Sequence, residues 1–233
     1  MTREMPEWAD KLIGFDLETT GVDVDTARIV SAAVVDYDDG RHEDTVTWEV
    51  DPGIEIPEEA SVVHGVWDHQ RTGRQDHDTA VLEIVEELWD AWGAGYTVAV
   101  FNAPFDLTIL QNLARGAGAE FTIGGNVIDA LVVDRYLDPY RKGRRSLSAA
   151  CQFYGVDLDN AHTAEADANA AVGVSLKVAE RWPGELAGET LMERQAEWSR
   201  ENDKGLVLWM RKQGRPLKGL RTGWPVRDPL PRG

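Results

Sequence analysis

An acidic pair lies at the end of the first apolar run of this chain, in the sequence Phe15-Asp16-Leu17-Glu18. The run from Lys11 to Leu17 is too short for a helix and contains no proline, which predicts a β-strand. Because side chains two residues apart project from the same face of a strand, Asp16 and Glu18 would share one small volume. Repulsion between the two carboxylates and the loss of their hydration then cost several kcal/mol, unless a bound cation compensates. Oxygen ligands of this kind suit Mg²⁺ or Mn²⁺. The simpler alternative is an edge strand whose acids lie in water.

Apolar periodicity predicts a mixed α/β fold. Four further strands are expected at residues 28–37, 45–50, 97–101 and 126–128. Helices are expected at residues 79–92, 104–115, 130–137, 146–154, 164–181 and about 185–211. The segment 51–75 contains prolines and glycines and is expected to be irregular. Three strands in a meander, followed by alternating helices and strands, indicate a mixed five-stranded sheet flanked by helices.

Length and charge divide the chain into two parts. Its 233 residues suit one domain with an appendage, and we expect a domain at 1–183 and a C-terminal helix with a basic arm at 184–233. The net charge is −17, yet residues 204–233 carry eight basic residues and one acid, which gives +7. The other 203 residues therefore carry −24. The acidic body argues against a polyanionic partner, and the basic arm weakens that argument.

The composition indicates a protein of the cytoplasm with no membrane partner. No run of eighteen apolar residues occurs, and the first ten residues lack the apolar centre of a signal peptide. The single cysteine, Cys151, cannot form an internal disulfide, which fits a reducing compartment.

A second acidic motif, Asn102-Ala103-Pro104-Phe105-Asp106, lies where the fourth strand gives way to a helix. Proline is favoured at the first helical position, so Asp106 would lie in the first turn. Asp106 could simply stabilise its helix. The alternative is a carboxylate at the carboxyl end of a sheet strand, where open α/β sheets bind ligands. Asn102 has the same two interpretations, and the residues slightly favour a helix cap.

A third motif contains His162 and Asp167. Ala164, Asp167, Ala168 and Ala171 share one face of the predicted helix, so its small residues would let Asp167 approach the sheet. His162 would precede the first turn and reach the same site from a loop. A lone histidine before a helix is ordinarily a surface or capping residue, whereas an inward acid on an alanine face is harder to explain without a ligand.

Taken together, three motifs resemble a known family in order and spacing. They are Phe15-Asp16-Leu17-Glu18-Thr19-Thr20-Gly21, Asn102-x-x-Phe105-Asp106 and His162-x-Ala164-x-x-Asp167. This set resembles the DEDDh subclass of DnaQ-like 3′→5′ exonucleases, the family of the polymerase III epsilon proofreading subunit and RNase T. A sister subclass has a tyrosine four residues before the last acid, where this chain has Thr163. Val62-Val63-His64-Gly65 also resembles a family segment beside the terminal nucleotide.

The resemblance implies an RNase H-like fold and two Mg²⁺ ions, for which Mn²⁺ can substitute. Asp16, Glu18, Asp106 and Asp167 would be the metal ligands, with Asp16 shared between the ions. His162 and Glu18 would be the catalytic residues. His162 would take the proton from the attacking water, since imidazole is the side chain that titrates nearest neutral pH.

The same resemblance implies which residues contact the substrate. These are Leu17, Thr19, Thr20, His64, Asn102 and Phe105. Turn formation before Gly21 is an alternative role for the two threonines. Core packing is an equally good interpretation of Phe105.

The sequence therefore predicts a metal-dependent 3′→5′ exonuclease that releases nucleoside 5′-monophosphates from single-stranded ends, DNA before RNA. Two other classes stay open. One is a binding module without catalysis, and the other is a subunit that works on a polymerase or repair partner. The basic cluster at 141–145 would be a solvated loop or a phosphate contact. Trp198 and Trp209 are expected to pack in the core, whereas Trp224 in the arm could stack on a base.

Overall fold

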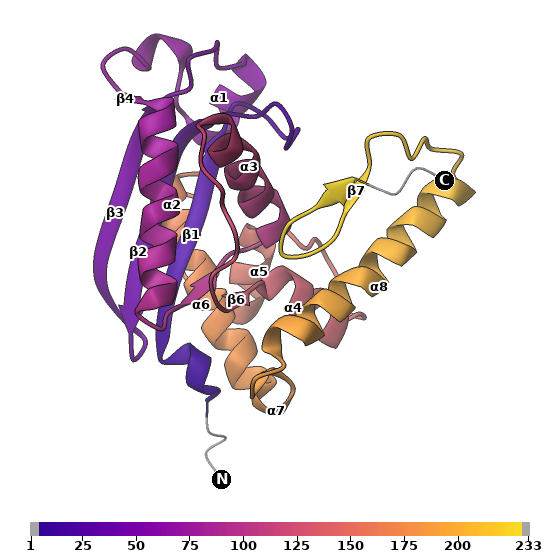
Figure 1. The fold of residues 1–233 in the computed structure, drawn as a ribbon. Coiled ribbons are helices and arrows are strands. Elements are labelled where there is room, and N and C mark those ends of the chain that lie inside the picture. Colours follow the sequence, from indigo (N-terminus) through magenta and orange to yellow (C-terminus); the bar gives the residue numbers. More distant parts are fainter. Residues whose placement is uncertain (1–4, 230–233) are drawn as a thin grey trace.

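A computed structural model describes residues 5–229. The last four residues of the predicted arm and the first four of the N-terminal segment lie outside this range. A six-stranded sheet forms the centre of the molecule (Figure 1). In spatial order its strands are β4 (Gln75–Asp76), β3 (Arg41–Asp51), β2 (Ile29–Asp38), β1 (Lys11–Thr19), β5 (Thr97–Ala99) and β6 (Val127–Ile128). The predicted mixed sheet is confirmed. Its sixth strand, β4, has only two residues and was missed within the segment expected to be irregular.

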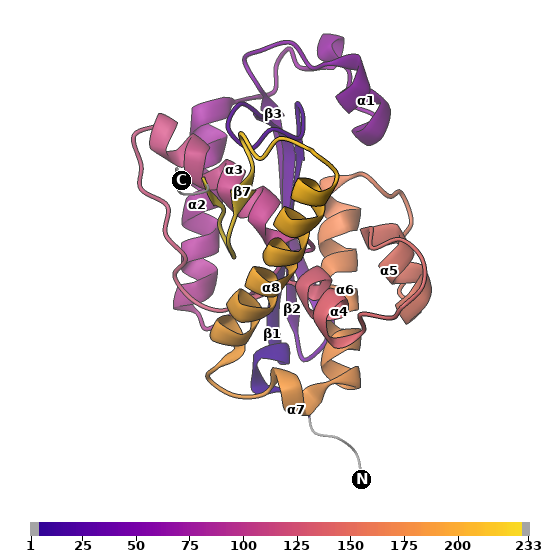
Figure 2. The same cartoon turned by 90° about the vertical axis from the view of Figure 1, so that its right-hand side faces the viewer.

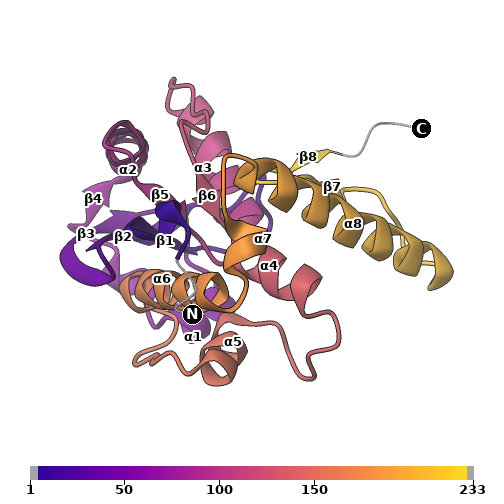
Figure 3. The ribbon, with the colours of Figure 1, turned by 90° about the horizontal axis from the view of Figure 1, so that it is seen from below.

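The helices cover both faces of the sheet. In chain order they are α1 (Glu58–His64), α2 (His77–Gly93), α3 (Ala103–Gly116), α4 (Ala130–Leu137), α5 (Leu147–Tyr154), α6 (Ala164–Arg181), α7 (Pro183–Leu186) and α8 (Leu191–Lys212). The sheet lies between α2 and α3 on one side and α6 on the other (Figure 3). Short 3-10 helices occur at Glu7–Ala9 and Asp68–Gln70. Among the described residues, no helix has the length and apolarity needed to cross a membrane.

Strand β1 is central, with antiparallel β2 on one side and parallel β5 on the other. Ile13, Phe15 and Leu17 enter the core shared with α2 and α3, whereas Leu12 enters the core under α6. Asp16 follows the alternation and faces α6. The two-residue period of the strand thus directs the acidic pair to the α6 side.

A glycine lets α6 lie directly against β1. A Cβ atom at Gly14 would lie 2.4 Å from the carbonyl oxygen of Ala168 and 2.8 Å from Cγ2 of Val172. Ala168 is fully buried at this contact. The predicted alanine face of the helix therefore meets the one β1 position where the strand leaves room for it.

Helix α8 packs its first half on the body and extends its second half away from it (Figures 1 and 3). Trp198 in the first half is 7% exposed, which confirms core packing, but Trp209 is 46% exposed. The prediction for Trp209 was wrong because its amphipathic stripe continues beyond the part of the helix that has a packing surface. The Arg215 guanidinium lies 4.7 Å from the Trp209 ring centroid.

The chain returns from α8 to the body as a small hairpin, β7 (Arg221–Thr222) and β8 (Asp228–Pro229). Figure 2 shows this hairpin beside the outer half of α8. The Arg221 guanidinium pairs with the Asp25 carboxylate in the loop after β1. The backbone N–H of Gly223 donates to Oδ2 of Asp203 on α8, at 2.9 Å. Part of the basic arm is therefore bound to acidic groups of the body.

Candidate active site

Three carboxylates from two elements meet at the end of β1. Asp16, Glu18 and Asp167 each offer an oxygen atom, and the three atoms lie within 4.8 Å of one another. Asp16 and Glu18 project from β1, and Asp167 lies in the first turn of α6. Glu18 is only 9% exposed. The close contact at Gly14 brings the helix and the strand together at this point.

Asp106 approaches from α3, on the other side of β1. It lies in the first helical turn, as predicted, and is 3% exposed. Its Oδ1 accepts a hydrogen bond from the backbone N–H of Leu17, at 3.2 Å. That amide lies between the two acids of β1, so Asp106 is fixed beside them although it is not one of the three clustered residues.

The electrostatics of this cluster favour a bound cation. Burial raises the pKa of Asp16 well above its usual range, and the charge of Asp106 adds to the effect. Burial and the charge of Asp167 raise the pKa of Glu18 to about 7. Buried carboxylates that repel each other in this way are stabilised as anions by a divalent ion. An all-carboxylate donor set is also what Mg²⁺ and Mn²⁺ prefer, so the residues present fit such an ion.

His162 lies directly before α6, in the loop position that the sequence predicted. Its backbone is left-handed, with φ of 70°, and its N–H donates to Oδ1 of Asp167 at 3.2 Å. The imidazole Nδ1 lies 4.0 Å from Oδ2 of Asp167, and the side chain is 54% exposed. Thr163 caps the helix through its hydroxyl. The imidazole thus lies next to the acidic cluster and remains open to water.

The hydroxyls of Thr19, the last residue of β1, and of Thr20 make hydrogen bonds within the turn that follows the strand. The Thr19 hydroxyl donates to the carbonyl of Gly21 at 2.9 Å, and the Thr20 hydroxyl accepts from the N–H of Arg28 at 3.0 Å. Both residues are buried. The Leu17 side chain is buried as well, in the α2 and α3 core. These contacts agree with turn formation, and the contact to substrate stays a prediction for all three residues.

His64 ends α1 with one ring nitrogen unsatisfied. Its Nδ1 accepts from the N–H of Val66 at 3.1 Å, while its buried Nε2 has no partner. Burial lowers the pKa of His64, and the nearby backbone of Thr19 partly opposes this shift. Val62 and Val63 on the same helix are exposed. A neutral histidine with an unpaired nitrogen beside the β1 turn is suited to bind a polar group of a ligand.

Asn102 takes the N-cap position of α3 without capping it. Its φ is 75°, and its side chain makes no cap hydrogen bond, so the helix-cap interpretation was wrong. The carboxylate of Asp129 replaces it, accepting from the N–H groups of Asn102 at 3.1 Å and Ala103 at 3.0 Å. Asn102 Oδ1 lies 3.5 Å from Nη2 of Arg227 in the arm. Phe105 is half-buried beside the α2 and α3 core.

Asp129 was missed by the sequence reading. It is fully buried at the end of β6, and it also accepts from the N–H of Leu131 and from Nε1 of Trp224. An acid between a short apolar strand and a helix is the pattern of an N-cap, which could have indicated it.

The basic cluster at 141–145 is mainly structural. Arg141 binds Asp134 through two hydrogen bonds of 2.8 Å, and Arg145 binds the same carboxylate at 2.6 Å. Asp134 is fully buried. Tyr154 also donates to it, at 2.7 Å. Two of the four basic residues in the cluster, Arg141 and Arg145, are thus engaged in a buried ion cluster, whereas Lys142 and Arg144 are exposed and phosphate contact stays a prediction for them.

Comparison with known proteins identifies the family to which this chain belongs. Residues 13–175 match the RNase T family, described as "Exonuclease". The PolC-type DNA polymerase III of Lacticaseibacillus paracasei is 29% identical over 178 residues, which are 76% of this chain and 12% of the polymerase. The PolC-type enzyme of Clostridium perfringens is 27% identical over 165 residues, 71% of this chain and 11% of the polymerase. The chain thus spans only a small part of these relatives.

Solved structures show the same fold. E. coli Exonuclease I in complex with a dT13 oligonucleotide has a TM-score of 0.63 and 16% identity, over 75% of this chain and 42% of that chain. Exonuclease I from Methylocaldum szegediense has a TM-score of 0.62 and 23% identity, over 75% of this chain and 41% of that chain.

Proposed function

The chain belongs to the RNase T family of exonucleases, and on that premise we propose that it is a metal-dependent 3′→5′ exonuclease. Its expected products are nucleoside 5′-monophosphates from single-stranded nucleic acid, DNA before RNA. One observation carries the proposal: Asp16, Glu18 and Asp167 bring carboxylate oxygens within 4.8 Å of one another. His162 lies beside them with its imidazole open to water.

Asp16, Glu18, Asp106 and Asp167 would hold two Mg²⁺ ions, with Asp16 shared between them. When bound, the ions supply charge stabilisation to the attacking and leaving oxygens of the phosphodiester. Repulsion among these partly buried carboxylates would favour a bound divalent cation over an empty site.

The protein's own groups would position and activate the water. His162 would accept its proton at an imidazole nitrogen, and the adjacent Asp167 carboxylate would stabilise the imidazolium that forms. The backbone N–H of His162 donates to Asp167, which holds the loop that carries the imidazole beside the acidic cluster. Glu18 would act as the second catalytic residue.

Substrate contacts would surround this centre. Leu17 and Thr19 lie in β1 and Thr20 follows it. His64 ends α1, and Asn102 and Phe105 lie at the start of α3. Of these, the unpaired Nε2 of His64 and the side chain of Asn102 offer polar atoms. We assign catalysis to residues 1–183 and retention of the substrate to residues 184–233.

A second candidate is an exonuclease that works within or beside a DNA polymerase. It is favoured by the match to PolC-type polymerases over three quarters of this chain. The two candidates share the same active site and differ in the partner. A binding module without catalysis is the weaker alternative, because all four acids and His162 are present.

The test is a degradation assay with 5′-labelled single-stranded DNA, double-stranded DNA and RNA, each with Mg²⁺, Mn²⁺ or EDTA. We expect stepwise shortening of single strands from the 3′ end, mononucleotide products, and no reaction in EDTA. Adding a polymerase, with size-exclusion of the mixture, separates the second candidate from the first. Binding without shortening under every metal condition would contradict both.

A further inference from the structure

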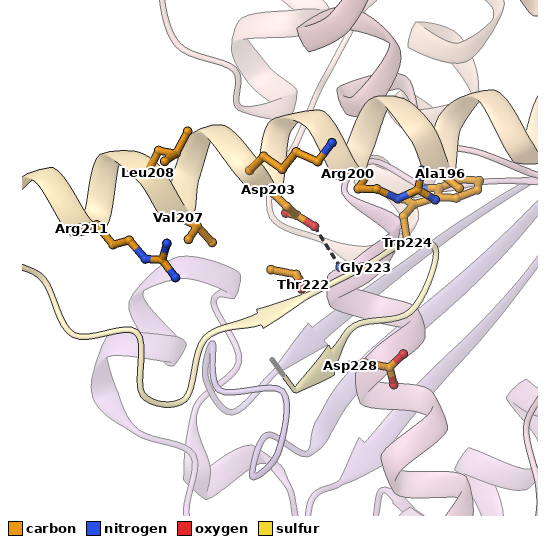
Figure 4. Close-up of a pocket in the computed structure, with 11 residues that line it drawn as sticks. Ala196, Arg200, Asp203, Val207, Leu208, Arg211, Thr222, Gly223, Trp224 and Asp228 are labelled. Carbon is orange, nitrogen blue, oxygen red and sulfur yellow. Dashed lines mark hydrogen bonds between the residues drawn. The ribbon is translucent and has the colours of Figure 1, made fainter. Parts of the chain in front are cut away.

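A pocket of about 630 Å³ lies between α8 and the C-terminal hairpin, beyond the residues that match the exonuclease family (Figure 4). Its lining from α8 includes Arg200, Asp203, Lys204, Val207, Leu208 and Arg211, and its lining from the hairpin includes Thr222, Gly223, Trp224 and Asp228. None of these side chains has a role in the proposed reaction.

Two guanidinium groups of this pocket are available to an anion. Among the described residues, Arg200 and Arg211 have no ion-pair partner, whereas Lys204 pairs with Glu201 at 2.6 Å. Asp203 is engaged by the N–H of Gly223 (Figure 4). Asp228 lies at the other end of the lining, apart from both arginines (Figure 4). Arg200 and Arg211 therefore present unpaired positive charge beside the Asp203 carboxylate, on a chain whose net charge is −17.

The rest of the lining is apolar and aromatic. Leu208 is 63% exposed and lies in the apolar run of residues 206–210 in the second half of α8. Trp224 directs its indole N–H to Asp129, so its ring contributes carbon surface to the pocket. Guanidinium groups beside an aromatic ring suit a single-stranded nucleic acid, because arginines bind its phosphates and aromatic rings stack on its bases.

The hairpin connects this pocket with the candidate active site. On the side facing α3, the N–H of Arg227 donates to the Thr108 hydroxyl at 2.9 Å. The Arg227 guanidinium lies 3.5 Å from Oδ1 of Asn102, which begins the helix that carries Asp106. One short hairpin thus contacts Asn102, a residue predicted to bind the substrate, on one side and lines the pocket on the other.

We infer that this pocket binds nucleotides of a single strand several positions upstream of the 3′ end, with Arg200 and Arg211 on phosphates and Trp224 and Leu208 on bases. The inference rests on the proposed function, since it extends the path of the same substrate. One arginine of the arm is unavailable for this role, because Arg221 is paired with Asp25. The single strand is preferred to an acidic protein segment because its bases match the aromatic lining.

The test compares Arg200→Gln/Arg211→Gln with a control of equal charge change, Arg41→Gln/Lys177→Gln. Arg41 begins β3 and Lys177 lies in the second half of α6, so both are away from the pocket. Binding of 5′-labelled oligothymidylates of 4 and 16 nucleotides is measured by fluorescence anisotropy, with Ca²⁺ in place of Mg²⁺. Circular dichroism and thermal unfolding verify that both variants are folded.

We expect the pocket variant to bind the 16-mer at least tenfold more weakly and the 4-mer as well as wild type does. Its slope of log K against log[salt] should be shallower by about 1.4, since each phosphate contact contributes about 0.7 for a single strand. The control should match wild type on both oligomers. A pocket variant that equals the control in affinity and slope would overturn the inference.

Competition by poly-glutamate as strong as that by unlabelled 16-mer would also overturn it, because the pocket would then select anions and not nucleotides. Since binding is measured without turnover, the result does not depend on catalysis. A wild-type protein that binds the 16-mer through this pocket but never shortens it would refute the exonuclease proposal and retain the pocket.

Discussion

The indole Nε1 of Trp224 lies 3.3 Å from Oδ2 of Asp129, which joins the C-terminal hairpin to the end of the parallel strands. Asp129 is fully buried and also accepts from the backbone N–H groups that begin α3. A segment that lies outside the family match therefore supports the helix on which Asp106 is placed.

Replacing Trp224 with Phe keeps an aromatic ring at this position and removes the indole N–H donor. We expect the free energy of unfolding to fall by about 1–2 kcal/mol, because a hydrogen bond to a buried charged group is lost. Denaturant titration measures it. Trp89→Phe is the matched control, since its N–H donates to the carbonyl of Thr122 at an exposed position and its loss can be made good by water. Equal losses in the two variants would show that the Asp129 contact contributes nothing particular.

Asp16→Asn should abolish turnover and leave the fold intact. If Asp16 is shared between two ions, Asn cannot replace it there. Removal of one carboxylate also relieves the burial of a charge and the repulsion from Asp106, the two largest causes of the raised pKa of Asp16. The thermal midpoint in EDTA should therefore stay level or rise, and Mg²⁺ should stabilise the variant less than wild type. Asp157→Asn, in the loop after α5, is the control. A variant with near wild-type turnover would remove Asp16 from the site.

His162→Ala should slow turnover by roughly 10²–10⁴-fold, the usual contribution of a general base. Its affinity for Mn²⁺, measured by calorimetry, should change little, since the acids remain. His69→Ala, in the short helix before β4, should behave as wild type. A loss of Mn²⁺ affinity as large as that of Asp16→Asn would instead make His162 a ligand.

The protein in EDTA should lose stability as pH rises from about 4.5 to about 7. Glu18 has a pKa raised to about 7 in the folded state, against 4.5 for an ordinary glutamate. Between these values the unfolded chain releases the Glu18 proton and the folded chain retains it, so a rising pH favours unfolding, by at most about 3 kcal/mol. Glu18→Gln should flatten the stability profile in this window, and saturating Mg²⁺ should do the same. A slope that is identical in wild type and variant would contradict the assignment.

Gly14→Ala should push α6 away from β1. The new methyl would lie 2.4 Å from the carbonyl oxygen of Ala168, which is backbone and cannot move alone. We expect a loss of about 2–3 kcal/mol in stability, together with weaker Mn²⁺ binding as Asp167 separates from the β1 acids. Gly93→Ala, where a Cβ meets nothing within 4 Å, is the control and should be neutral. Unchanged Mn²⁺ affinity in a destabilised Gly14→Ala would separate the packing contact from the site.

The sequence predicted those features that follow from local periodicity. Asp16 and Glu18 share a face because a strand has a period of two, and Asp106 lies in the first turn because proline begins its helix. Features that depend on tertiary partners were not predictable. Nothing local showed that Arg141 would meet a buried Asp134, 7 residues away along the chain.

The sequence also did not show how far along each element the packing surface extends. The stripe that contains Trp198 continues to Trp209, and only the extent of the body decides which of the two is covered. Strand β4 is too short to show alternation, and it forms because its two residues pair with the end of β3.

The division of the site between a strand and a helix end has a consequence for how activity is lost. Asp16 lies on the central strand, paired on both sides, whereas Asp167 and His162 depend on a single turn capped by Thr163. Opening one terminal turn requires far less free energy than unfolding the sheet. We therefore expect fraying of α6 to separate Asp167 and His162 from the β1 acids while the sheet stays folded, and we expect heating to abolish the proposed activity reversibly below the melting temperature.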